Sequence, residues 1–113
     1  MTIQYKNQGF SLATTNVTTV FTCPTSGVAI VKSVSIANDH SADVQVKSSL
    51  TDTSAGATYN YFIKTMTSDS SDNAVSGILN LEGGDKINFE CTVSNVITGV
   101  VNYALIDRSQ ENG

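Results

Sequence analysis

The sequence predicts an all-β fold, namely a single antiparallel β-sandwich of about seven or eight strands, jelly-roll or immunoglobulin-like. Val, Ile and Thr make up 34 of the 113 residues, and such β-branched side chains suit sheets and lose rotamer freedom in helices. Short segments of alternating polarity recur with turn residues between them. Since no segment longer than one turn shows a 3.6-residue period, no crossover helix supports a parallel sheet. The layer rules then leave a two-sheet sandwich or a small barrel.

We expect one domain over residues 1–113, because a typical domain has roughly 100–150 residues.

The first predicted strands are short. Strand signals at 3–5 and 10–12 lie in an N-terminal segment, 1–15, that is a candidate arm for contacts with partners. Residues 17–23 alternate, which places Val17, Thr19, Phe21 and Cys23 on one face.

The middle of the chain continues the pattern. Residues 24–27, with Pro first and Gly last, predict a turn. Residues 28–37 are apolar or small on both faces, which is typical of a central strand. A turn at 38–41 leads to an alternating strand at 43–50, and the small residues of 51–57 predict a loop.

The later strands are separated by a polar stretch and a glycine turn. Residues 59–64 form a strand with aromatic side chains on both faces, and 67–73 is the most polar stretch, which we interpret as a surface loop. Residues 75–81 predict a strand, and 82–85 a tight turn with two glycines. Residues 86–93 alternate best of all, with Ile87, Phe89, Cys91 and Val93 on one face.

The last strand, 96–107, has apolar side chains on both faces. Its odd face carries Ile97, Val101, Tyr103 and Leu105. A sandwich has only one inner face per sheet, so some of Val96, Val100 and Ile106 should face solvent or a partner. A cover formed by the N-terminal residues Ile3, Tyr5, Phe10 and Leu12 would serve equally well.

Residues with apolar or aromatic side chains on a second face are the candidates for a partner interface. Tyrosine suits this role, because it is rigid and amphipathic. The candidate interface residues are Tyr5, Phe10, Tyr59, Phe62, Val96, Val100 and Ile106.

The sequence contains few residues that could form a catalytic or metal-binding site. His40 is the only histidine and lies in a predicted turn beside Asp39 and Ser41, but sequence neighbours do not form a triad. The polar run 69–73 lacks the glycine and bidentate glutamate of a calcium loop. We therefore expect a protein that is not an enzyme, with no catalytic residue, no metal site and no cofactor.

Two cysteines and six basic residues exclude further classes. Cys23 and Cys91 form no CxxC pair, so we expect buried free thiols rather than a zinc site, although a disulfide is possible on number alone. The basic residues are spread singly, which argues against nucleic-acid binding. No signal peptide and no membrane-spanning stretch is recognisable, so we expect a soluble protein that is made without secretion.

Two segments resemble small virion proteins of tailed bacteriophages. Residues 17–38, VTTVFTCPTSGVAIVKSVSIAN, are similar to their aromatic strand, Pro-x-x-Gly turn and AIVKSxxIAN strand. Residues 79–87, LNLEGGDKI, resemble their late Leu-x-x-Gly-Asp-x-Ile hairpin. The segments cover about a quarter of the chain, and Cys23 stands where an aliphatic residue is more usual.

The resemblance implies a non-enzymatic structural protein located in the virion. It implies a capsid decoration or cement protein that stabilises the phage head, works as a homo-oligomer, often a trimer, and binds the major capsid protein or other virion proteins. A neck, tail or fibre-docking component is one alternative, and a carbohydrate-binding β-sandwich module is another. The resemblance implies no catalytic residue.

The neutral surface chemistry points the same way. Ser, Thr and Asn together number 38 residues, whereas charged residues are only 14 % of the chain. Interfaces are depleted in Lys and Glu relative to free surfaces. We therefore interpret the low charge as a surface made to be covered by neighbouring proteins.

Overall fold

The computed structural model describes residues 2–75 and 77–107; the polar tail predicted at the C-terminus lies outside this range. It contains nine strands in two antiparallel sheets, which confirms the predicted all-β sandwich. Sheet A has the order β1-β9-β3-β6, with β7 also paired to β3, and sheet B has the order β2-β8-β4-β5. The strands are β1 (Thr2–Ser11), β2 (Thr18–Thr22), β3 (Gly27–Asn38), β4 (Val44–Asp52), β5 (Ala57–Met66), β6 (Ser70–Asn73), β7 (Leu79–Leu81), β8 (Lys86–Cys91) and β9 (Ile97–Asp107).

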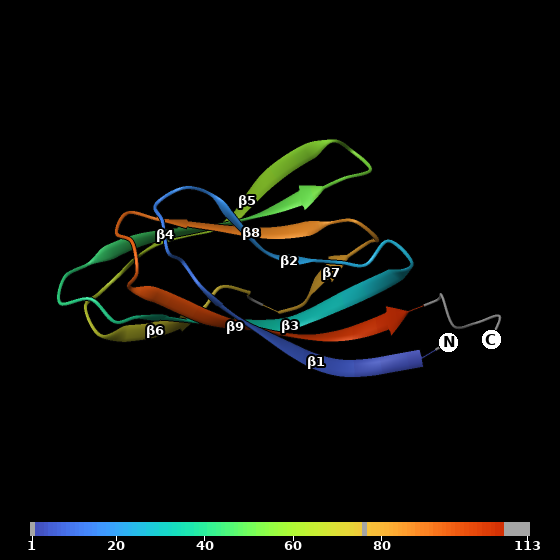
Figure 1. Ribbon diagram of the computed structural model, residues 1–113, viewed down its shortest axis with the longest axis horizontal. Coiled ribbons are helices and arrows are strands. Elements are labelled where there is room, and N and C mark those ends of the chain that lie inside the picture. Colours follow the sequence, from blue (N-terminus) through green and yellow to red (C-terminus); the bar gives the residue numbers. More distant parts are fainter. Residues whose placement is uncertain (1, 76, 108–113) are drawn as a thin grey trace.

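This strand order decides between the two sandwich types that the sequence left open. The chain crosses repeatedly between the sheets, so that β1, β3, β6, β7 and β9 lie in one sheet and the others in the second. Two interleaved four-stranded sheets with this connectivity form a jelly roll, in which β6 and β7 together take the place of one strand. Figure 1 shows the two sheets as layers, with β1 along the lower edge and the β4–β5 hairpin curling away above.

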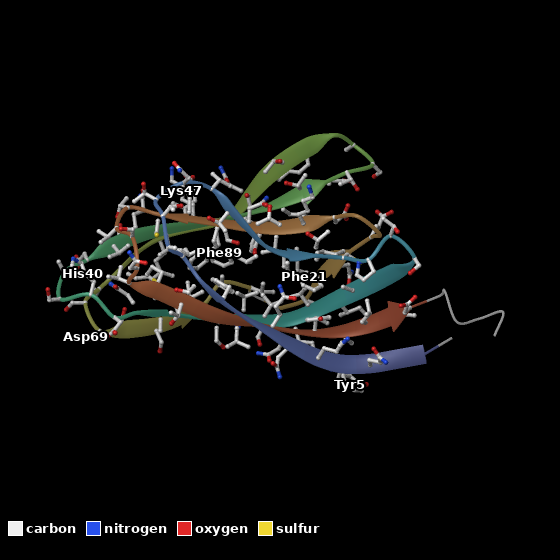
Figure 2. All side chains as sticks on the ribbon, viewed as in Figure 1. Tyr5, Phe21, His40, Lys47, Asp69 and Phe89 are labelled. Atoms are coloured by element: carbon white, nitrogen blue, oxygen red, sulfur yellow. The ribbon has the colours of Figure 1, made fainter. Side chains whose placement is uncertain are left out.

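Aromatic pairs join the two sheets in the core. The Phe10 ring of sheet A lies 5.0 Å from the Phe89 ring of sheet B. The Phe21 ring of sheet B lies 4.5 Å from the Tyr103 ring of sheet A. Figure 2 shows Phe21 and Phe89 between the layers. Full burial of such a side chain contributes about 1.5–3 kcal/mol, so these pairs are a main source of sandwich stability.

Three irregularities in the strand pairing change which side chains point inward. The register of β3 against β9 shifts between Val31 and Ser33, so Ala29 and Val31 are buried before the shift and Val34 and Ile36 after it. This β-bulge explains why both faces of residues 28–37 look apolar in the sequence, because the inward face changes parity at Lys32.

The other two shifts lie in sheet B. In β2 the shift between Thr19 and Phe21 buries both Val20 and Phe21, so the strict alternation predicted for residues 17–23 is wrong. The pairing of β4 with β5 shifts beside Ser48, whose Oγ donates a hydrogen bond to the Tyr61 hydroxyl at 2.6 Å. Burial raises the pKa of Tyr61, and the Ser48 hydrogen bond partly opposes that increase.

Several predicted boundaries also need correction. Segments 3–5 and 10–12 belong to one continuous strand, β1. The predicted surface loop 67–73 includes β6, which pairs with the end of β3. Of the predicted strand 75–81, the structure describes residue 75 and residues 77–81, and within these β7 alone is a strand.

Candidate docking face

The outer face of sheet A is built from three adjacent strands in matched register. Ile3 of β1 lies opposite Ile106 of β9, which lies opposite Val28 of β3. Two residues further along, Tyr5, Ala104 and Ile30 form a second row. Neighbouring side chains on one sheet face touch across the strands. These six residues form a continuous surface, called here the apolar patch: Ile3, Tyr5, Val28, Ile30, Ala104 and Ile106.

The patch is open to solvent on its β1 side. Tyr5 is 76 % exposed and Ile3 is 55 % exposed, whereas Ala104 is buried beneath its neighbours. Figure 2 shows Tyr5 projecting away from both layers of the sandwich. Apolar surface left in water costs about 25 cal/mol per Å² relative to burial, so covering this patch would be favourable.

Lys32 is the one charged side chain of this face in the described parts of β1, β3 and β9. Its Nζ lies 4.6 Å from the centre of the Tyr5 ring, as a cation–π contact. Lys32 lies at the β-bulge of β3, and its side chain therefore reaches across β9 to Tyr5 of β1. This contact links the Tyr5 side chain of the patch to β3, although the ring stays exposed to solvent.

The rest of the outer face consists of uncharged side chains that are mostly small or polar. Three further rows continue the register and are called here the neutral strip: Asn7, Asn102 and Ser33; Gly9, Val100 and Ser35; Ser11, Thr98 and Ala37. Asn102 Nδ2 donates to Ser33 Oγ at 3.0 Å. Val100 is 39 % exposed at one side of a shallow hollow of about 300 Å³ shared with Ala37 and Ser71. Such a surface presents neither strong charge nor a deep pocket to a neighbour.

The outer face of sheet B is different, because polar side chains around Asn88 hydrogen-bond to one another. Thr19 Oγ1 donates to Asn88 Oδ1 at 2.8 Å. Asn88 Nδ2 donates to Thr51 Oγ1 at 2.9 Å and to Ser49 Oγ at 3.3 Å. A polar network that is internally hydrogen-bonded has less to gain from a partner than an exposed apolar patch.

The structure brings three of the seven predicted interface residues together. Tyr5, Val100 and Ile106 lie on the outer face of sheet A. Tyr59 is exposed on β5, at the far edge of sheet B. Three others, Phe10, Phe62 and Val96, are half-buried against the core and do not belong to this face.

The alternative that the N-terminal segment covers the last strand is wrong. Strand β1 lies beside β9 in the same sheet, so Ile3 and Tyr5 extend the open face. Phe10 and Leu12 point into the core instead. Sequence reasoning missed that Val28 and Ile30 share this face, because the bulge hides the change of parity.

The residues considered for catalysis or metal binding do not converge on a site. His40 forms hydrogen bonds through its backbone, whose N–H donates to Asn38 Oδ1 at 3.0 Å. Asp72 forms an ion pair with Lys64 and accepts a hydrogen bond from it. This hydrogen bond is the main reason that the pKa of Asp72 is lowered, and a hydrogen bond from the Asn73 N–H is the second. Within residues 2–75 and 77–107, no group of three His, Cys, Asp or Glu side chains is placed to hold a metal ion. The same residues contain no helix long and apolar enough to cross a membrane.

Comparisons with family models and with curated protein sequences find no match. Solved structures do match. A chain from the capsid structure of Helicobacter pylori bacteriophage KHP30 is similar at TM-score 0.58 and 16 % identity, over 96 % of this chain and 90 % of that one. A chain from the infectious bursal disease virus particle is similar at TM-score 0.56 and 7 % identity, over 91 % of this chain. This chain spans 30 % of that viral chain.

A third similar structure is not viral. A chain from Bacillus endospore appendages, described as disulfide-linked pili, matches at TM-score 0.55 and 10 % identity, over 92 % of this chain and 86 % of that one. At these identities, the three likenesses together show a shared fold, the two-sheet β-sandwich.

Proposed function

We propose that this protein is a non-enzymatic structural component of a virus particle, and specifically a capsid decoration or cement protein of a phage head. The observation that carries the proposal is the outer face of sheet A, a broad surface with an exposed apolar patch and, in the described parts of β1, β3 and β9, one charged side chain, Lys32. Two further observations support it. The KHP30 capsid-structure chain has nearly the same extent as this one, and the sequence resembles small phage virion proteins.

The mechanism would be binding energy alone. A protein that binds the assembled shell and not the separated subunits stabilises the shell by mass action. The partner would be the major capsid protein or another virion protein, bound in the virion after synthesis in the host cytoplasm. A homo-oligomer, with a trimer favoured by the resemblance, would multiply weak contacts into firm attachment.

Two other functions remain to be separated by experiment. A neck, tail or fibre-docking component would use the same face, but it would be present in about a dozen copies per particle rather than hundreds. A carbohydrate-binding module would need exposed aromatics lining one groove, whereas the exposed Tyr5 and Tyr59 lie in different sheets. A lack of binding to any glycan on a glycan array would exclude the carbohydrate-binding function.

The likeness to an appendage subunit favours one further candidate, a subunit of an extracellular fibre. Linkage by disulfides, as in those pili, requires accessible cysteines. Cys23 and Cys91 are both buried here and unpaired. This burial argues against a fibre of the same chemistry.

The test uses particles with and without the protein. Phage heads made from a genome lacking this gene should release their DNA at lower temperature than complete heads, and added purified protein should restore the difference. Particles carrying the protein in shell-wide copy number, yet equally stable without it, would refute the cement function.

A further inference from the structure

Strand β1 forms a long and unprotected edge of sheet A. All ten of its residues are paired in unbroken register with β9 on one side. Among the described residues, no strand is paired with its other side. The strand contains no proline, no bulge and one charged residue, Lys6. Natural edge strands usually combine several such protections, and a single lysine on so long an edge points to an edge that is covered by another chain.

The direction of the free backbone groups follows from the register. Leu12 continues the pairing of β1 with β9, and its N–H donates to Ile97 O at 2.9 Å. Antiparallel partners alternate between hydrogen-bonded and non-hydrogen-bonded pairs. Even-numbered residues of β1 therefore bond to β9, and the odd-numbered Ile3, Tyr5 and Asn7 direct their N–H and C=O groups to the open edge.

We propose that β1 pairs with β1 of a second copy of this chain, antiparallel and about a two-fold axis at Tyr5, so that two copies share one continuous sheet. In this register Tyr5 faces the partner's Tyr5, Ile3 faces Asn7, and Gln4 faces Lys6. The three hydrogen-bonded pairs of odd residues exchange about six backbone hydrogen bonds.

Charge and chain path select this register. An axis at Lys6 would place two lysines directly opposite each other, which destabilises a strand pair. An axis at Asn7 would extend the pairing to Ser11, but there the chain turns toward sheet B, and Gln8 Nε2 is already bound to Val20 O at 2.6 Å. The axis at Tyr5 uses the half of β1 that leads away from this crossing.

The area that this contact would bury lies near the lower limit for a specific dimer. Seven paired residues give a ladder about 24 Å long. A sandwich is roughly 20 Å thick with its side chains, so each copy would cover about 500 Å² and the pair about 1,000 Å². The two apolar patches would also meet at the axis, since Ile3 and Tyr5 are their edge residues. One contact would thereby join two outer faces into a single wider docking surface.

The first experiment tests the register by cross-linking. Tyr5→Cys should form a disulfide-linked dimer on mild oxidation, because residues opposite each other have Cα atoms about 5.5 Å apart, within the range of a disulfide. Asn7→Cys is the matched control on the same face, with its two copies about 13 Å apart along the ladder. We expect at least ten times more cross-linked dimer from Tyr5→Cys. Equal cross-linking of both variants, or of neither, would overturn the proposal.

The second experiment tests the contact without a cysteine. Sedimentation of the unmodified protein should give a mass containing an even number of chains, and Tyr5→Lys should halve it. Asn7→Pro should act like Tyr5→Lys, because it removes an edge N–H and no bond to β9. Tyr59→Lys, on the opposite edge, is the control and should leave the mass unchanged. A trimer or monomer that none of these variants alters would refute the two-fold contact. These assays need no virus particle, so they can fail independently of the proposed function.

Discussion

Cys23 and Cys91 are buried as small apolar side chains, which confirms the expectation of free thiols. Cys23 Sγ lies 3.6 Å from Gly27 O and 3.7 Å from Leu81 O, where it acts as a weak donor between two strands. Burial is the main reason that the pKa of each thiol is raised above its ordinary value. The reactive thiolate is therefore scarcer at neutral pH than in an exposed cysteine.

Thiol reactivity should consequently depend on unfolding. At pH 8 a disulfide reagent should modify the folded protein at least tenfold more slowly than free cysteine, because both access and thiolate fraction are low. In denaturant, both thiols should react at once. Rapid modification of the folded protein would show that the cysteines are accessible and would revive the fibre candidate.

Asp85 fastens two loops at one end of the sandwich. Its carboxylate is buried and accepts hydrogen bonds from the Thr53 N–H at 3.1 Å and the Glu82 N–H at 2.9 Å. The second bond closes the turn predicted at 82–85, and the first ties this turn to the β4–β5 hairpin.

Asp85→Ala should therefore lower the free energy of unfolding by about 1–3 kcal/mol, because the Thr53 and Glu82 N–H groups lose the buried carboxylate that joins the two loops. Urea denaturation measures this change. Asp43→Ala, at an exposed position, is the control and should stay within about 0.5 kcal/mol of the unmodified protein. Equal effects of both variants would contradict the fastening role.

Gly99 of β9 lies opposite Phe10 of β1, and a side chain at this position would collide with its neighbours. A Cβ on Gly99 would lie 2.4 Å from Phe10 Cζ and 2.7 Å from Ser35 O. The space is needed by Phe10, whose ring packs on Phe89 across the core.

Gly99→Ala should destabilise the protein by about 1–3 kcal/mol, because the added methyl group displaces the Phe10 ring or the strand backbone. Gly9→Ala is the matched control, since a Cβ there would meet only Gly99 O at 3.8 Å. Thermal unfolding followed by circular dichroism compares the two. A loss of stability in Gly9→Ala as large as that in Gly99→Ala would contradict this account.

The alternation of polar and apolar residues predicted the positions of the strands well. It predicted which side chains point into the core only where the strand pairing is regular. In β8 and β9 the inward residues, such as Ile87, Phe89 and Val101, follow strict period two and were predicted correctly. In β2 and β3 a bulge changes parity within the strand, and nothing in the local sequence marks its position. For the same reason, Val28 and Ile30 were not among the residues predicted for the docking surface.

β6 was missed for another reason. Its sequence, SSDN, has the composition of a loop, and it is a strand because β3 offers an edge to pair with. Asn73 Oδ1 then accepts hydrogen bonds from the Val34 N–H at 3.0 Å and the Val75 N–H at 3.1 Å, where regular pairing ends. Tertiary context of this kind is not contained in local propensity.

At the scale of the molecule, the two sheets present different surfaces. Sheet B has a hydrogen-bonded polar network around Asn88 on its exterior, whereas the exterior of sheet A carries apolar and neutral side chains beside Lys32. Val100→Glu should therefore weaken attachment to the particle, since it would place a charge on the face to be covered. Its thermal unfolding should change little, because Val100 is already 39 % exposed.

Ile63→Glu is the matched control for this variant. Ile63 is also an exposed aliphatic residue in a strand, but it lies at the edge of sheet B. Binding to particles lacking the protein, measured by co-sedimentation, should fall at least tenfold for Val100→Glu and remain for Ile63→Glu. The reverse order would assign the docking face to sheet B.

The central claim is that the outer face of sheet A is covered in an assembled particle. An electron cryo-microscopy reconstruction of the phage particle, with this protein labelled, tests it most directly. The account predicts a jelly roll repeated over the head in hundreds of copies, with Tyr5 and Val100 buried against neighbouring proteins. A particle that lacks the protein, or that carries it with this face open to solvent, would contradict the claim.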